Sequence, residues 1–167
     1  MKDPVDHLFE QVRLRPDHPA VVQEGGGVSY GEFGALTNRI AAAIADVCEK
    51  PRVLIYLPKG YHAYGAMFGT LMAGGYYSPI NLDAPRRRQR DILHQFRPDI
   101  VLSTEELAAD LSAGDGSRFI DVEHLPSSEL SGPLEPQEIA YVIFTSGTTG
   151  QPKGVVISRR GLAHYTD

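Results

Sequence analysis

The sequence lacks the features that define several protein classes. It contains one cysteine, Cys48, so it cannot carry an internal disulfide framework. No apolar run approaches the roughly 20 residues that a membrane-spanning helix needs. The net charge of −5 argues against a general role on nucleic acids or membrane surfaces. The first residues are polar and lack the apolar core of a signal peptide, so we expect a cytoplasmic location.

Several catalytic and metal-binding signatures are also missing from the sequence. There is no G-x-S-x-G elbow and no G-x-G-x-x-G dinucleotide fingerprint. The six histidines form no zinc-like spacing with another histidine, a cysteine or an acidic residue. We therefore expect no nucleic-acid partner, no membrane partner and no metal site built from the side chains of this chain.

The sequence does contain alternating strand-like and helix-like segments. Residues 53–57 are continuously apolar, which is typical of a central strand covered on both faces. Ser29 and Glu32 form an S-x-x-E capping box, and apolar residues at three- and four-residue spacing follow it. The alternation continues to about Phe119. It predicts an α/β fold with a mixed, largely parallel sheet flanked by helices.

Four arginines open a further predicted helix, at positions Arg86, Arg87, Arg88 and Arg90. We interpret them as a solvated helix face, because no aromatic residues interleave with them as a single-strand nucleic-acid site would require. Docking of an acidic partner remains an alternative role for this group.

The stretch from Tyr141 to Val156 organises the chain. It begins with an apolar run, 141–144, of the kind that forms a buried strand, and a second apolar run follows at 155–157. Between them lies a loop of hydroxyls and glycines that ends on Lys153. Such a loop can bind phosphate, because glycines let the backbone approach a ligand and successive N–H groups converge on an anion. The alternative is a polar hairpin turn.

The candidate phosphate ligands are the hydroxyl residues, two glycines and the lysine of this loop: Thr145, Ser146, Gly147, Thr148, Thr149, Gly150 and Lys153. The loop is not a Walker A motif, because Pro152 precedes the lysine, Gly154 follows it, and a strand is predicted next. A helix dipole therefore cannot be the main attraction for an anion here.

The segment Thr145-Ser-Gly-Thr-Thr-Gly-Gln-Pro-Lys-Gly154 resembles the phosphate-loop signature of adenylate-forming, or AMP-binding, enzymes. Residues 71–85 resemble the L-x-A-G-x-x-Y-x-P-[IV]-[ND] element of amino-acid adenylation domains, with Ser78 and Asn81 where Val and Asp are commoner. The resemblance covers nearly the whole chain in order. It is closest to amino-acid adenylation domains and D-alanine–carrier-protein ligases, with acyl- and aryl-CoA ligases next.

The resemblance implies a ligase that works in two steps. A carboxylate, most simply that of an amino acid, attacks the α-phosphate of ATP and gives an acyl-adenylate and pyrophosphate. A thiol of a carrier protein or of CoA then takes the acyl group. Thr145 and Ser146 would bind ATP, and Lys153 would act as the catalytic cation that steadies the leaving pyrophosphate. Mg²⁺ is implied by the ATP.

Residues 1–167 would then be the N-terminal portion of an adenylation domain, truncated after the phosphate loop. Family members are much longer, so we expect this chain to be inactive alone and to act with the remainder of the enzyme. The competing interpretation is a non-catalytic interaction module that pairs with a second polypeptide. Apolar surface meant for the absent part predicts self-association.

Overall fold

The chain folds into alternating helices and strands, and the computed structural model describes residues 2–111, 116–146 and 151–166. The elements in chain order are α1 (Pro4–Leu14), β1 (Pro19–Gln23), β2 (Gly26–Ser29), α2 (Tyr30–Ala45), β3 (Arg52–Ile55), α3 (Tyr61–Met72), β4 (Tyr76–Pro79), α4 (Arg86–Phe96), β5 (Ile100–Ser103), α5 (Glu105–Asp110), β6 (Arg118–Asp121), β7 (Ile139–Ser146), β8 (Pro152–Ser158) and α6 (Arg159–Thr166). They follow the predicted alternation.

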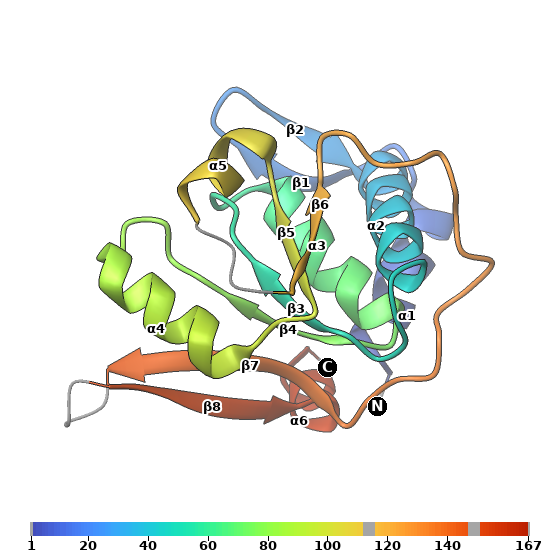
Figure 1. Cartoon of the computed structure of the whole chain (residues 1–167). Coiled ribbons are helices and arrows are strands. Elements are labelled where there is room, and N and C mark those ends of the chain that lie inside the picture. Colours follow the sequence, from blue (N-terminus) through green and yellow to red (C-terminus); the bar gives the residue numbers. More distant parts are fainter. Residues whose placement is uncertain (1, 112–115, 147–150, 167) are drawn as a thin grey trace.

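The main sheet has the strand order β6-β5-β3-β4-β7-β8, and β1 pairs with β2 in a separate two-stranded sheet (Figure 1). The pairs β3–β4, β3–β5, β4–β7 and β5–β6 are parallel. The pair β7–β8 is antiparallel. The predicted fold class, a mixed and largely parallel sheet with helices, is therefore confirmed.

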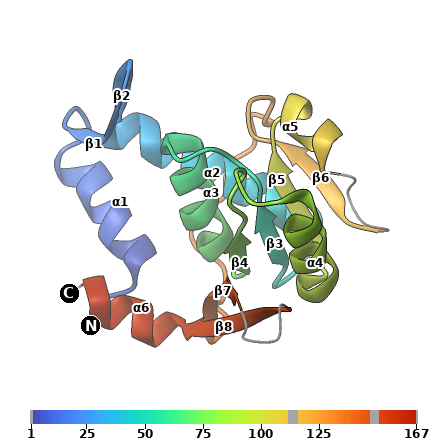
Figure 2. The ribbon, with the colours of Figure 1, turned by 90° about the vertical axis from the view of Figure 1, so that its left-hand side faces the viewer.

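Helices cover both faces of the main sheet, with α2 and α3 on one side and α4 on the other (Figure 2). Successive side chains of a strand point to opposite faces. In β3, Val53 and Ile55 therefore join the apolar cluster under α2 and α3. Leu54 and the following Tyr56 join the cluster under α4. This two-sided burial explains why residues 53–57 are continuously apolar.

The predicted capping box at the start of α2 is present. The Ser29 hydroxyl accepts a hydrogen bond from the Glu32 N–H, and the Glu32 carboxylate accepts one from the Ser29 N–H at 2.8 Å. The backbone N–H groups of Ser29 and Glu32, at the start of the helix, are both satisfied in this way. The local sequence signal therefore fixes where α2 begins.

The first and last described segments are joined by a buried arginine. Arg159, at the start of α6, is 8% exposed, and it donates to both carboxylate oxygens of Asp3 and to the Leu71 carbonyl oxygen at 2.8 Å. Asp3 also caps α1, because its side chain accepts from the Val5 N–H. The start of α1 therefore lies against α6 (Figure 2).

Candidate functional site

The predicted phosphate loop lies at the end of the β7–β8 hairpin. Thr145 pairs with Lys153, and Ser146 pairs with Pro152, in the antiparallel ladder. These candidate ligands are therefore strand residues, and the loop between the strands is shorter than the sequence suggested. The candidates Gly147, Thr148, Thr149 and Gly150 lie outside the described residues.

The hairpin brings the lysine and one hydroxyl together. Residues directly opposite each other in an antiparallel pair share a face of the sheet, so Thr145 and Lys153 lie on one face and Ser146 on the other. The Thr145 hydroxyl donates to the Lys153 carbonyl oxygen at 3.4 Å. All three residues are exposed. A ligand can therefore reach a cation and two hydroxyl groups at this end of the hairpin.

The apolar run that begins β7 is buried only in its first part. Val142 is 8% exposed, whereas Ile143 is 39% exposed, so the prediction of a buried strand over 141–144 is wrong at its end. The reason is the length of the neighbouring strand. Tyr77 of β4 pairs with Tyr141, but β4 ends two residues later while β7 continues to Ser146.

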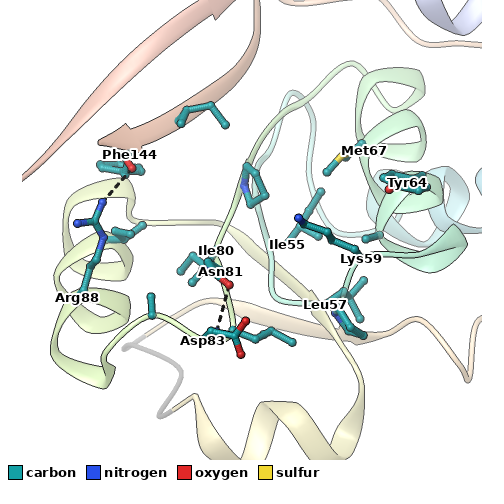
Figure 3. Close-up of a pocket in the computed structure, with 17 residues that line it drawn as sticks. Ile55, Leu57, Lys59, Tyr64, Met67, Ile80, Asn81, Asp83, Arg88 and Phe144 are labelled. Atoms are coloured by element: carbon teal, nitrogen blue, oxygen red, sulfur yellow. Dashed lines mark hydrogen bonds between the residues drawn. The ribbon is translucent and has the colours of Figure 1, made fainter. Parts of the chain in front are cut away.

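A cavity of about 880 Å³ opens beside the hairpin, at the carboxyl ends of β3 and β4 (Figure 3). Its wall is mostly apolar and includes Ile55, Met67, Ile80, Ile143 and Phe144, with the charged groups of Lys59, Asp83 and Arg88. Open α/β sheets bind their ligands outside the carboxyl ends of the parallel strands. The hairpin end and this cavity therefore lie at the edge of the sheet where a ligand is expected.

A buried glutamine fixes the rim of the cavity. Gln89 is 1% exposed, and its amide nitrogen donates to the carbonyl oxygens of Leu82 at 2.9 Å and Ala84 at 3.0 Å. Its amide oxygen accepts from the Tyr56 hydroxyl at 3.2 Å. The loop between β4 and α4 is thus held by one side chain, which the sequence does not reveal because Gln89 stands among arginines.

The arginines of α4 do not all belong to a solvated face. Arg88 is half-buried, and its Nη2 donates to the Phe144 carbonyl oxygen at 3.2 Å (Figure 3). Arg86 is exposed but donates to the Tyr56 hydroxyl at 3.0 Å. Arg87 and Arg90 are exposed as predicted. A signal for Arg88 was available, because it precedes the buried Ile92 by four residues and so shares its helix stripe.

Over residues 2–111, 116–146 and 151–166, no three histidine, cysteine or acidic side chains are placed to hold a metal ion. The hydroxyls and the lysine of the hairpin suit an anion such as phosphate. In the same part of the chain, none of the helices has both the length and the apolar character needed to cross a bilayer. The cytoplasmic location stays a prediction.

Comparison with protein families gives one model that matches nearly the whole chain. The model describes the AMP-binding enzymes and matches residues 8–167. Among curated proteins, the chain is 34% identical over 163 residues to gramicidin S synthase 2 of Brevibacillus brevis, covering 94% of this chain and 4% of that protein. It is 35% identical over 169 residues to tyrocidine synthase 1 of Brevibacillus parabrevis, covering 96% of this chain and 16% of that protein. The chain therefore spans a small part of these relatives.

Solved structures show the same fold. The nonribosomal peptide synthetase FmoA3, bound to α-methyl-L-serine-AMP, superposes with a TM-score of 0.85 at 31% identity, over 98% of this chain and 18% of that chain. The N-terminal subdomain of NpsA from Klebsiella oxytoca superposes with a TM-score of 0.81 at 21% identity, over 98% of this chain and 43% of that chain. The phosphate-loop sequence, the fold and the matching family model agree, and the chain belongs to the AMP-binding enzyme family of adenylate-forming ligases.

Proposed function

We propose that the end of the β7–β8 hairpin binds the phosphates of ATP, as part of an enzyme that activates an amino acid. The observation that carries the proposal is the pairing of Thr145 with Lys153 at an exposed strand end. A lysine ammonium is a compact charge with three donors on a flexible stem, so it can follow a phosphate group as the group moves. Ser146 would add a hydroxyl donor, and so would Thr145 once its hydroxyl turns away from the Lys153 carbonyl oxygen. The predicted ligands Gly147, Thr148, Thr149 and Gly150 would complete the loop.

In the proposed reaction, a carboxylate oxygen bonds to the α-phosphorus of ATP and the bond from that phosphorus to the bridging oxygen of pyrophosphate breaks. Negative charge grows on the leaving pyrophosphate. Lys153 near those oxygens would stabilise the charge more in the transition state than in the bound substrate, which is the requirement for catalysis. A carrier-protein thiol would then take the acyl group and release AMP.

Mg²⁺ would enter this site with the nucleotide. Mg²⁺ is commonly bound through substrate phosphates together with one or two carboxylates and several waters. Its chemistry would be to neutralise phosphate charge. Among the described residues, the hairpin end offers no carboxylate, and its ammonium group has no lone pair for a metal. The proposal therefore assigns no ligand of this chain to Mg²⁺.

The named relatives support an amino acid as the substrate class. Gramicidin S synthase 2 and tyrocidine synthase 1 are more than 30% identical to this chain, and FmoA3 was solved with the adenylate of an amino acid. An amino acid and a carrier protein are therefore the substrate and acceptor that we propose. An acyl- or aryl-CoA ligase is the second candidate, and a non-catalytic module that pairs with another polypeptide is the third.

The proposal is tested by calorimetric titration of the 167-residue chain with Mg·ATP and with Mg·pyrophosphate. Lys153→Ala should weaken both affinities roughly tenfold or more, the cost of losing one hydrogen bond from a charged donor. Lys153→Arg keeps the charge. Arg160→Ala removes one charge from an exposed position on α6 and should leave both affinities within about twofold, because exposed charges are screened. Equal losses in Lys153→Ala and Arg160→Ala would contradict the assignment of Lys153.

We further propose that catalysis needs segments that the longer relatives have and this sequence does not contain. Pyrophosphate exchange with the chain alone should show no turnover for any amino acid, and turnover would refute this part. Exposed apolar side chains on the hairpin, Ile143, Val155 and Val156, suit a covering partner. Light scattering tests the self-association that they predict, and a monomer at all concentrations would argue against it.

A further inference from the structure

The end of β7 has a peptide group that no neighbouring parallel strand supports. β4 ends at Pro79, which lies level with Ile143, because Tyr77 pairs with Tyr141 in parallel register. The next residue, Phe144, therefore lies past the end of β4. A backbone carbonyl in this position needs a donor from elsewhere. Arg88 of α4 supplies it, with Nη2 at 3.2 Å from the Phe144 oxygen.

Helix α4 contacts Phe144 at a second point. The Phe144 ring packs edge-on against the ring of Phe96, with centroids 6.3 Å apart and planes at 89°. Arg88 and Phe96 are two turns apart on α4, and the buried Ile92 lies between them on the same stripe. The helix is itself anchored to the sheet, since Gln89, next to Arg88, is buried and bonded to the β4–α4 loop.

The orientation of one peptide plane follows from these contacts. The Phe144 carbonyl and the Thr145 N–H belong to the same planar, trans peptide group. A hydrogen bond from Arg88 to the carbonyl therefore fixes the direction of the Thr145 N–H as well. It also fixes where the Thr145 side chain leaves the backbone, and Lys153 is its partner in the ladder.

We propose that Arg88 is a positioning residue for the phosphate site. It holds the peptide group between Phe144 and Thr145 in place. The inference rests on the proposed function, because it assigns Arg88 a role in the phosphate binding of that site. Arg88 need not touch the nucleotide. A lysine keeps a charged donor on a long flexible stem at this position, whereas a methionine keeps an apolar stem and removes the donor.

The test is calorimetric titration of the 167-residue chain with Mg·pyrophosphate. Arg88→Met should weaken binding roughly tenfold, as expected when a bond from a charged donor is lost. Arg88→Lys should bind within about threefold of the wild type. Arg87→Met and Arg90→Met are matched controls, because each removes the same charge from an exposed position of the same helix. They should change the affinity by less than about twofold.

Hydrogen exchange distinguishes positioning from a general loss of stability. In Arg88→Met without ligand, amides of residues 142–146 should exchange faster while those of 53–55 in the central strand stay protected. If Arg88→Met fails to fold, Arg88→Lys decides: a folded Arg88→Lys in which the amides of residues 142–146 exchange faster while pyrophosphate affinity is unchanged overturns the proposal.

Three results separate this inference from the proposed function. Wild-type binding that is unchanged in Arg88→Met overturns the positioning role and leaves the phosphate site standing. Equal losses in the variants of Arg87, Arg88 and Arg90 also overturn it, because they would show an effect of charge alone. A wild-type chain that binds no pyrophosphate contradicts the proposed function, and the inference falls with it.

Discussion

Gly154 lies opposite Phe144 in the β7–β8 ladder, and the missing side chain of the glycine leaves the space that the Phe144 ring occupies. A Cβ at position 154 would meet the Phe144 ring at 3.3 Å and the Val142 Cγ1 at 3.0 Å. The glycine after the lysine therefore leaves room for this packing. It lets the hairpin hold Phe144 against α4 while Lys153 and Thr145 stay exposed.

Gly154→Ala should destabilise the chain by about 1–2 kcal/mol, because the added methyl group overpacks the contact between β8 and β7. Denaturation in urea measures this change. Gly132→Ala is the matched control, since a Cβ there would meet nothing within 4 Å. A Gly154→Ala variant as stable as the wild type would show that the Phe144 ring moves aside at no cost.

Two buried serines with different partners give a second prediction. Ser78 and Ser103 are both fully buried. The Ser103 hydroxyl donates to the Tyr56 carbonyl oxygen at 2.8 Å, whereas the Ser78 hydroxyl has no hydrogen-bond partner among the described residues. Ser103→Ala should lower the free energy of unfolding by about 1–2 kcal/mol. Ser78→Ala should leave it unchanged or raise it by up to about 1 kcal/mol. Urea unfolding of both variants checks this, and equal losses would contradict it.

The ion pair between Arg52 and Asp99 predicts a dependence of stability on pH. The Asp99 carboxylate accepts from the Arg52 N–H at 2.8 Å and from its guanidinium at 3.0 and 3.2 Å. Hydrogen bonding to Arg52 lowers the pKa of Asp99 below its usual value. The stabilisation is therefore complete above the unfolded-state pKa of about 3.9 and is lost as pH falls through the lower folded-state pKa.

Asp99→Asn should lower the free energy of unfolding by roughly 1 kcal/mol or less at pH 7, because both side chains of the pair are more than one third exposed. The difference in free energy of unfolding between the variant and the wild type should shrink when urea unfolding is repeated near pH 3. Glu129→Gln, at an exposed position of the connection before β7, should show no such change. A constant difference between pH 7 and pH 3 would refute the role of the Asp99 charge.

Arg159 gives a prediction about the link between the two ends of the fold. Arg159→Met removes the donor to the buried Leu71 carbonyl and leaves the Asp3 carboxylate without its cationic partner. We expect a loss of about 2–4 kcal/mol in urea unfolding, with faster hydrogen exchange in α1. Arg160→Met, next to it and exposed, should be neutral. Equal effects at the two positions would contradict the importance of the buried contact.

The features that were predictable from sequence depend on neighbours along the chain. The Ser29–Glu32 capping box is a local pattern, and the structure has both of its hydrogen bonds. The continuous apolar run at 53–57 indicated a strand covered on both faces, which β3 is. The resemblance of the phosphate-loop sequence identified the family, which the family model confirms.

The features that were missed depend on strand order and on which elements meet. Ile143 is exposed because β4 ends beside it. The length of β4 cannot be predicted from residues 141–144. Arg88 is held by a contact with Phe144, which is distant in the sequence. Gln89 is held by contacts with the β4–α4 loop, and these depend on how that loop turns. The spacing of Arg88 from Ile92 indicates that it lies on the buried stripe of the helix, but nothing near it in the sequence identifies the Phe144 carbonyl as its partner.

The position of β7 between β4 and β8 has a consequence for the order of folding. The strands β3 to β6 are complete by Asp121, and they pair with one another without β7. During synthesis this parallel sheet can therefore form before the hairpin leaves the ribosome. The contact between Arg88 and Phe144 would then form late. Its loss is expected to speed unfolding more than it slows folding.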